Sequence, residues 1–478
     1  MNPLLLLLAV ACFEICVLGL GWPLAALWTA FALIPVIELM KRLLFVFDTT
    51  TMVEYLSVKV IPDLLLLSAI GGVTAAALLD SKRRYLALVQ PLDIAVGLLI
   101  LWNFFSVLNP SRPLLIGLAG FQYTGIPILY YIVGRTIFWQ PARFRNLLRL
   151  TLFMGMITGA YGWYHIAYGM TEFEYTWLES GLTSLRPAFI YVSGLLRIFS
   201  SFQSHGEFAA YLVVALFALY LLRDSLSSPI KVLALAVMVV PLVHTFARDG
   251  WVVFFGAILI AWWVRHPRLL RHAPIIGILV APALIGVFGN WVWAGGLGAL
   301  IPQDSSLAAA AMGSGTYGAR VLGWQNAIQN PDVYFSLVGQ GIGAIFAGAR
   351  LGAQAYENPH NGVLEIALEN GLVGLVIFYV VIFGLWRVSL RAIDTVPAGQ
   401  AEQAVVLVGL CAGVLLSNAL IGNYLARRPA AIYFWLSLGV LHSWAISHVH
   451  AHSKLLKAKR KGAPSPVPHA PDEQQVSA

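Results

Sequence analysis

The sequence predicts an all-α polytopic membrane protein with about 12 transmembrane helices and one large loop on the outer side. Three observations support this fold class. Of the 478 residues, only 30 are Lys or Arg and 22 are Asp or Glu, so 11% are charged, against about 25% in soluble domains. Apolar residues make up 59%, and the mean hydropathy is +0.78. Apolar runs close to 20 residues, roughly the length that crosses a bilayer, recur along the chain.

The apolar runs expected to span the membrane are residues 60–79, 86–108, 114–134, 147–167, 206–222, 230–247, 251–264, 273–294, 362–386, 403–425 and 430–447. Residues 1–40 hold either one kinked span or a short hairpin around Gly21-Trp22-Pro23, and one net crossing there gives an even total near 12. The first residues lack the basic segment and the cleavage pattern of a signal peptide, so we expect this segment to be retained.

Basic clusters indicate the topology, because Lys and Arg are enriched in cytoplasmic loops. The clusters stand on alternate connections, at 82–84, 135–149, 223–231, 265–271, 387–391 and 454–461. The opposite connections are then periplasmic or extracellular: 109–113, 168–205, 248–250, 295–361 and 426–429. We therefore predict a membrane domain, residues 1–447, with outer loops 168–205 and 295–361. Residues 448–478 are predicted to form a cytoplasmic tail that is first basic and then disordered.

The composition also excludes several function classes. A cytosolic enzyme, a nucleic-acid-binding protein and a disordered chain do not combine so much apolar surface with so few charges. The net charge of +8 is explained by topology and requires no anionic macromolecule. Cys12, Cys16 and Cys411 lie in apolar stretches without a CxxC pattern, so neither a disulfide framework nor a metal site is predicted. The absence of internal repeats disfavours a carrier.

Three arginines stand out, because a charged side chain at membrane depth is costly and requires a partner or a function. Arg248 lies between two apolar runs with almost no loop. It either pairs with Asp249 or contacts lipid headgroups, or it presents a bidentate guanidinium to a phosphate. Arg197 leads from an outer loop into the next span. Arg320 precedes Trp324 by four residues in the large loop, where a cation–π pair is the alternative to a binding role.

The most informative group surrounds His360. Pro359 favours the entry to a helix and places His360 at its start. Asn361, Glu365 and Glu369 recur every four residues and therefore share one helix face. A histidine beside carboxylates at the mouth of a cavity is suited to proton transfer near neutral pH, although a lone histidine is often structural.

These residues resemble motifs of the O-antigen ligase and polysaccharide polymerase superfamily of bacterial envelopes. His360-Asn361, nine further residues and Gly371-Leu372-Val373-Gly374 are similar to the family signature: His, a small amide or hydroxyl residue, nine others, Gly, two others and Gly. Residues 318–324, which include Arg320 and Trp324, resemble the segment that opens the family's large loop, and 339–343 resemble its glycine-rich stretch.

Arg248 stands at the position of the family's Ser/Thr-Arg-Gly-Trp turn. Here Ala247 replaces the usual hydroxyl residue, and Asp249 is inserted before Gly250-Trp251. These two differences change the expected partner of Arg248, but the arginine itself is present.

The resemblance implies a metal-independent, inverting glycosyltransferase of the integral-membrane GT-C type that needs no cofactor. Such enzymes are multi-pass proteins of the bacterial inner membrane with a periplasmic active site. They transfer a glycan from undecaprenyl diphosphate to an acceptor glycan or to lipid A core. The site residues implied are His360 as activator of the acceptor hydroxyl, Arg248, Arg320 and Arg197 as diphosphate ligands, and Asn361, Glu365, Glu369 and Trp324 as supporting residues.

Several functions remain open within this resemblance. Asn109-Pro110-Ser111-Arg112-Pro113, followed by Phe121-Gln122-Tyr123, resembles a feature of exopolysaccharide polymerases and favours a polymerase. An O-antigen ligase is the alternative, and a protein O-oligosaccharyltransferase is disfavoured because the sequence contains no sizeable soluble C-terminal domain. A lipid-linked oligosaccharide flippase is the competing class, but it should carry its charges along a path through the bundle rather than at the outer face.

Overall fold

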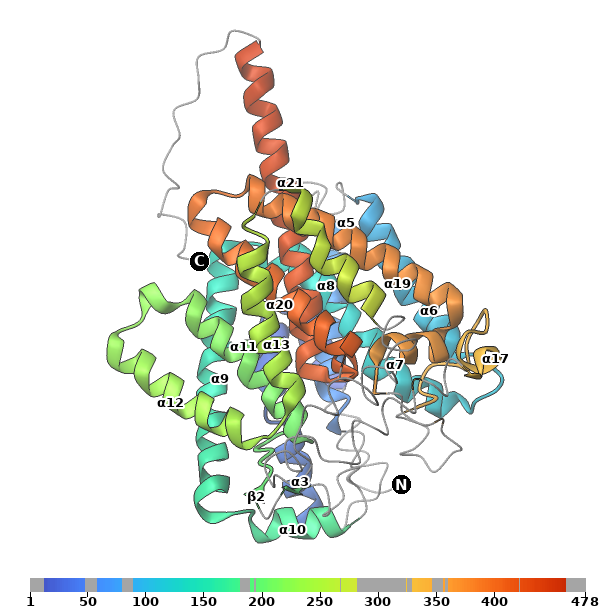
Figure 1. Cartoon of the computed structure of the whole chain (residues 1–478), viewed down its shortest axis with the longest axis vertical. Coiled ribbons are helices and arrows are strands. Elements are labelled where there is room, and N and C mark those ends of the chain that lie inside the picture. Colours follow the sequence, from blue (N-terminus) through green and yellow to red (C-terminus); the bar gives the residue numbers. More distant parts are fainter. Residues whose placement is uncertain are drawn as a thin grey trace, which may run out of the picture.

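The computed structural model describes residues 13–47, 58–79, 89–180, 190–192, 195–266, 268–281, 324, 329–345, 356, 360–420 and 422–460. These parts form a bundle of helices with one small antiparallel β pair (Figure 1). The elements are α2 (Pro23–Leu33), α3 (Ile37–Phe47), α5 (Ile61–Leu79), α6 (Pro91–Val107), α7 (Leu114–Ile128), α8 (Tyr130–Val133), the π-helix η2 (Gly134–Phe138), α9 (Pro141–Tyr168), α10 (Glu172–Glu179), β1 (Tyr191–Val192), β2 (Leu195–Leu196), α11 (His205–Leu221), η4 (Arg223–Ser225), α12 (Ser228–His244), α13 (Arg248–Trp263), η5 (Arg268–His272), α17 (Pro331–Tyr334), α19 (Gly362–Thr395), α20 (Ala398–Leu420), η8 (Tyr424–Ala426) and α21 (Arg428–Arg460).

Each apolar run predicted from residue 60 onward coincides with a helix, although only the first part of 273–294 is described, within a helix at 270–281. The described segments contain four helices that are long and apolar enough to cross a membrane: Leu114–Phe138, Gly362–Thr395, Gly399–Leu420 and Arg428–Ser447. A fifth candidate joins α2 and α3, which are bent by 68°. These helices indicate a membrane protein, whereas the total of about 12 spans stays a prediction.

The centre of the bundle is formed by α11, α20 and α21. In the most apolar 18-residue stretches of α20 and α21, 83% and 89% of the residues are buried inside the protein. Helix α11 is buried from residue 208 to 219. Such helices have apolar residues on all sides because neighbouring helices cover every face. Gly409 and Gly413 of α20 bring its backbone against that of α13, as small residues do between membrane helices.

The signature glycine Gly371 bends α19 and divides it into a short first part and a long second part. Its φ of 67° and ψ of −174° lie in a region that is open almost only to glycine. A Cβ atom at Gly371 would overlap the backbone of Gly339, and a Cβ atom at Gly339 would lie 2.5 Å from the nitrogen of Gly371. The structure thus packs the predicted glycine-rich stretch directly against the signature glycine.

We expect Gly371→Ala to lower the free energy of unfolding by about 1–3 kcal/mol from backbone strain alone. The overlap with Gly339 adds to this cost. Gly97→Ala in α6 is the matched control, because open space surrounds Gly97 and alanine favours a helix. Thermal unfolding of the detergent-solubilised proteins measures both variants. Equal melting temperatures for Gly371→Ala and the wild type would contradict the close packing.

The two ends of the chain differ in part from the sequence expectation. Helical segments are interrupted at Trp22 and again at 34–36, so the first region contains two breaks rather than one. Helix α21 continues through residue 460, so the basic part of the predicted tail is helical. Residues 462–478, expected to be disordered, lie outside the described residues.

Candidate functional site

Four helices begin close together, and we call this region the site end of the bundle. The helices are α11, α13, α19 and α21, which start at His205, Arg248, Gly362 and Arg428. Backbone N–H groups at a helix start are unpaired and carry a partial positive charge. Several helix starts in one place therefore favour a bound anion.

The connection between α20 and α21, residues 422–427, joins these helix starts. The carbonyl oxygen of Gly422 accepts a hydrogen bond of 3.2 Å from the Gly362 nitrogen, at the start of α19. Arg427 pairs with Asp249 in the first turn of α13, and its guanidinium packs against Gly206 in the first turn of α11. The signature region and the Arg248 turn are therefore neighbours in the fold.

The predicted arginines Arg197 and Arg248 meet at the turn before α13. Arg248 is exposed and is the first residue of the helix. The Arg197 guanidinium donates to the carbonyl oxygens of Thr245 and Phe246, at 3.4 and 3.2 Å. Phe246 has a positive φ of 49°. Arg197 thus stabilises the backbone that presents Arg248.

His360 is exposed immediately before the start of α19. The next residue, Asn361, caps the helix, because its Oδ1 accepts hydrogen bonds from the nitrogens of Val363 and Leu364 at 3.0 and 3.2 Å. Its Nδ2 donates to the carbonyl oxygen of Ala419 in α20 at 2.7 Å. The signature amide is therefore an N-cap that attaches the helix start to α20 and places His360 beside the connection.

The two carboxylates predicted on the same face of α19 are buried, and they lie near different segments. Glu369 Oε1 accepts a hydrogen bond of 3.2 Å from the Ile345 nitrogen and also interacts with the backbone of Gly343. Glu369 thereby holds the glycine-rich stretch. Glu365 lies near Asn423, in the connection between α20 and α21.

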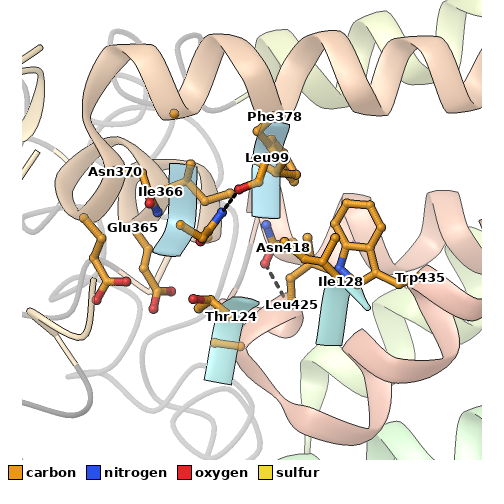
Figure 2. Close-up of a pocket in the computed structure, with 15 residues that line it drawn as sticks. Leu99, Thr124, Ile128, Glu365, Ile366, Asn370, Phe378, Asn418, Leu425 and Trp435 are labelled. Atoms are coloured by element: carbon orange, nitrogen blue, oxygen red, sulfur yellow. Dashed lines mark hydrogen bonds between the residues drawn. The ribbon is translucent and has the colours of Figure 1, made fainter. Parts of the chain in front are cut away.

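A cavity of about 50 Å³ lies behind this helix face, enough for a few water molecules at roughly 10–15 Å³ each. Figure 2 shows Glu365 and Asn370 on one side and Ile128 and Trp435 on the other. In the described parts of the chain, Asn370 Oδ1 is buried without a hydrogen-bond partner. The polar side of the cavity therefore suits water or a polar ligand.

The remaining predicted residues of the large loop are placed only in part. Trp324 is 1% exposed and packs in a small core with Tyr334, Leu364 and Leu368. It therefore supports the first part of α19. Arg320 lies outside the described residues, so its predicted diphosphate contact and its alternative pair with Trp324 stay predictions.

Two basic groups at the site were missed in the sequence. Arg427 contacts Asp249, and although burial alone would lower the pKa of Arg427, Asp249 raises it. Its neighbour Arg428 is buried and pairs with Asp63 of α5. Two adjacent arginines in a predicted outer connection contradict the positive-inside rule, and this signal could have indicated their importance.

Arg42 of α3 supports the segment that follows Arg197. It is fully buried, pairs with Glu174 of α10 at 3.0 Å and donates to the carbonyl oxygen of Ser200 at 2.7 Å. Burial would raise the pKa of Glu174, but the hydrogen bond with His165 and the charge of Arg42 hold it below its usual value. The predicted outer loop 168–205 is thus anchored through an ion pair.

Across the described ranges, no three His, Cys, Asp or Glu side chains are grouped to hold a metal ion. The site end instead presents guanidinium groups, helix starts and an exposed imidazole. Guanidinium groups bind phosphate oxygens with a bidentate geometry, and an imidazole can take up a proton near neutral pH.

Comparison with known proteins gives a family match over part of the chain. Residues 233–379 match the family described as O-antigen ligase, a range that contains Arg248, Arg320 and His360 but not Arg197. The family is glycosyltransferase-like and acts on lipid-linked glycans in the membrane. No curated protein matches the chain. The match over residues 233–379 supports the O-antigen ligase superfamily that the sequence motifs predicted.

Proposed function

We propose that the protein transfers a glycan from undecaprenyl diphosphate to an acceptor hydroxyl at the periplasmic face of the bacterial inner membrane. The observation that supports this most directly is the grouping of Arg248, Arg427 and His360 around one connection, inside or beside the family match. The reaction transfers a sugar from an anionic leaving group to a hydroxyl nucleophile. The site end offers cationic groups for the leaving diphosphate and an imidazole for the hydroxyl.

In this proposal, His360 takes the proton of the acceptor hydroxyl as its oxygen attacks the anomeric carbon. The bond from this carbon to the diphosphate oxygen breaks, and the undecaprenyl diphosphate leaves with the electron pair. Arg248 and Arg320 stabilise the charge that develops on the diphosphate. A single displacement inverts the anomeric centre, and none of these steps requires a metal ion. Arg197 acts mainly by holding the Arg248 turn.

The acceptor class favoured is a second lipid-linked glycan, which makes the protein an exopolysaccharide or O-antigen polymerase. The segments 109–113 and 121–123 support this choice. Arg112 lies over the ring of Tyr356, 5.1 Å from its centroid, and Asn109 donates to the carbonyl oxygen of Gly339 at 3.1 Å. The polymerase-like segment is therefore in contact with the glycine-rich stretch of the site.

Reconstitution of the purified protein in nanodiscs tests the function. With undecaprenyl-diphosphate-linked repeat units as donor and acceptor, a polymerase yields longer chains and free undecaprenyl diphosphate. Transfer to added lipid A core instead identifies a ligase, and transfer to a Ser or Thr peptide identifies a protein O-oligosaccharyltransferase. In closed liposomes, movement of the donor between leaflets without any new glycosidic bond would replace the enzyme assignment by a flippase.

A further inference from the structure

Asp249 is one of the two residues by which this chain departs from the turn that it resembles. It is 8% exposed, and its carboxylate pairs with Arg427. Its Oδ1 also accepts a hydrogen bond of 3.0 Å from the Gly250 nitrogen. The carbonyl oxygen of Asp249 accepts a hydrogen bond from Ser417 at 3.3 Å. The Asp249 carboxylate thus neutralises the Arg427 guanidinium next to Arg248. The diphosphate of the proposed donor would bring its own negative charge to the same place.

Arg427 is only partly satisfied by this pair. Its side chain is 23% exposed, and its ring contact is with Tyr424, 5.2 Å from the guanidinium carbon. Nη1 is buried against Gly206 and has no hydrogen-bond acceptor among the described residues. The pair with Asp249 therefore leaves one buried donor of this guanidinium without an acceptor, which is costly.

Positive charge exceeds negative charge around Arg427. The charges of Arg197 and Arg427 both act on His205, at the start of α11. The acidic groups that act on Arg427 are Asp249 and, more weakly, Glu207. With exposed Arg248 and the helix starts added, the cluster favours an anion with more than one charge.

We propose that Asp249 is the resting counter-ion of Arg427 and that the diphosphate of the lipid-linked donor displaces it. Arg427 then becomes a further guanidinium ligand of the diphosphate, one that the family motifs do not include. The identity of the donor rests on the proposed function. The exchange forms and breaks no covalent bond. Asp249 also competes with the product, undecaprenyl diphosphate, and so favours its release.

Binding of undecaprenyl diphosphate to the full-length protein in nanodiscs tests the exchange without requiring catalysis. Asp249→Asn removes the competing charge, and we expect the Kd to fall by about tenfold. Arg427→Gln should raise the Kd by about tenfold, the scale of one charged hydrogen-bonded contact. The double variant should match Arg427→Gln, because Asp249 acts through Arg427. Undecaprenol, which lacks phosphate, should show no difference among the variants.

Further variants separate the exchange from a structural role. Arg427→Lys keeps the charge for Asp249 but loses the planar fork, so it should fold normally and still raise the Kd. Glu402→Gln is the control. Glu402 pairs with Arg223 at 2.7 Å, and Arg223 follows the end of α11 that lies away from the site end. Its Kd should equal that of the wild type.

Two outcomes would overturn the exchange. One is an Asp249→Asn variant that binds undecaprenyl diphosphate more weakly than the wild type, which would make the pair a structural contact only. The other is an unchanged Kd in both Arg427 variants. The proposed function fails separately, if the wild-type protein neither binds undecaprenyl diphosphate nor transfers glycan. If transfer and binding occur but Asp249→Asn does not bind more tightly, only the exchange is wrong.

Discussion

His360→Ala is expected to reduce the initial rate of glycan transfer by roughly 10²–10⁴-fold, the usual contribution of a positioned general base. The imidazole is exposed at the start of α19, outside the hydrophobic core. Its removal should therefore leave the melting temperature of the protein nearly unchanged. Transfer rates with the reconstituted protein, measured beside thermal unfolding, separate lost chemistry from lost structure.

The control for this variant is His266→Ala, since His266 follows the far end of α13. It should transfer glycan at the wild-type rate. In cells, His360→Ala should accumulate single repeat units or unligated polymer on the outer side of the membrane. Accumulation on the cytoplasmic leaflet would indicate transport and would contradict the enzyme assignment, as would full activity of the purified variant.

Arg248→Lys should have the second largest effect, a loss of about 10–100-fold in kcat/KM for the lipid-linked donor. Lysine keeps the positive charge but lacks the planar fork that binds two phosphate oxygens at once. Because Arg248 is exposed at the first position of α13, lysine should fit there without strain. The measurement is kcat/KM at varied donor concentration, which reports lost stabilisation of the transition state relative to the free enzyme and donor.

Arg265→Lys provides the matched control, because Arg265 is also exposed but lies beyond the other end of α13. It should retain wild-type kinetics. Full activity of Arg248→Lys would show that Arg248 contributes only charge. Full activity of Arg248→Ala as well would remove this residue from the site and leave Arg427 and Arg320 as the candidate cations.

Helix positions and the local arrangement around His360 follow from the sequence because both depend on short-range patterns. An apolar run of sufficient length forms a helix in a membrane, where backbone groups must be paired within the segment. Asn361, Glu365 and Glu369, which the spacing predicts to share one helix face, are all buried. The His-Asn to Gly signature correctly indicated the superfamily, which residues 233–379 match.

The functions of individual polar residues were harder to predict. Asn361 was expected to support the site, but the structure shows how: it caps α19 and binds α20. Glu369 was also expected to support the site, and the structure shows that it holds the glycine-rich stretch. Arg42 carried no predicted role, yet it is a buried partner of Glu174. In each case the partner is distant in the chain, so spacing along the sequence carries no information about it.

The sequence by itself determined that this is a helical membrane protein with His360 at a helix start, and it predicted the O-antigen ligase match that residues 233–379 show. Only the tertiary structure decided which cations lie near His360, because the pairing of Asp249 with Arg427 depends on how the start of α13 meets the connection between α20 and α21. Hydrophobic periodicity is read from neighbouring residues, whereas ion pairs between helices form only after the bundle has packed.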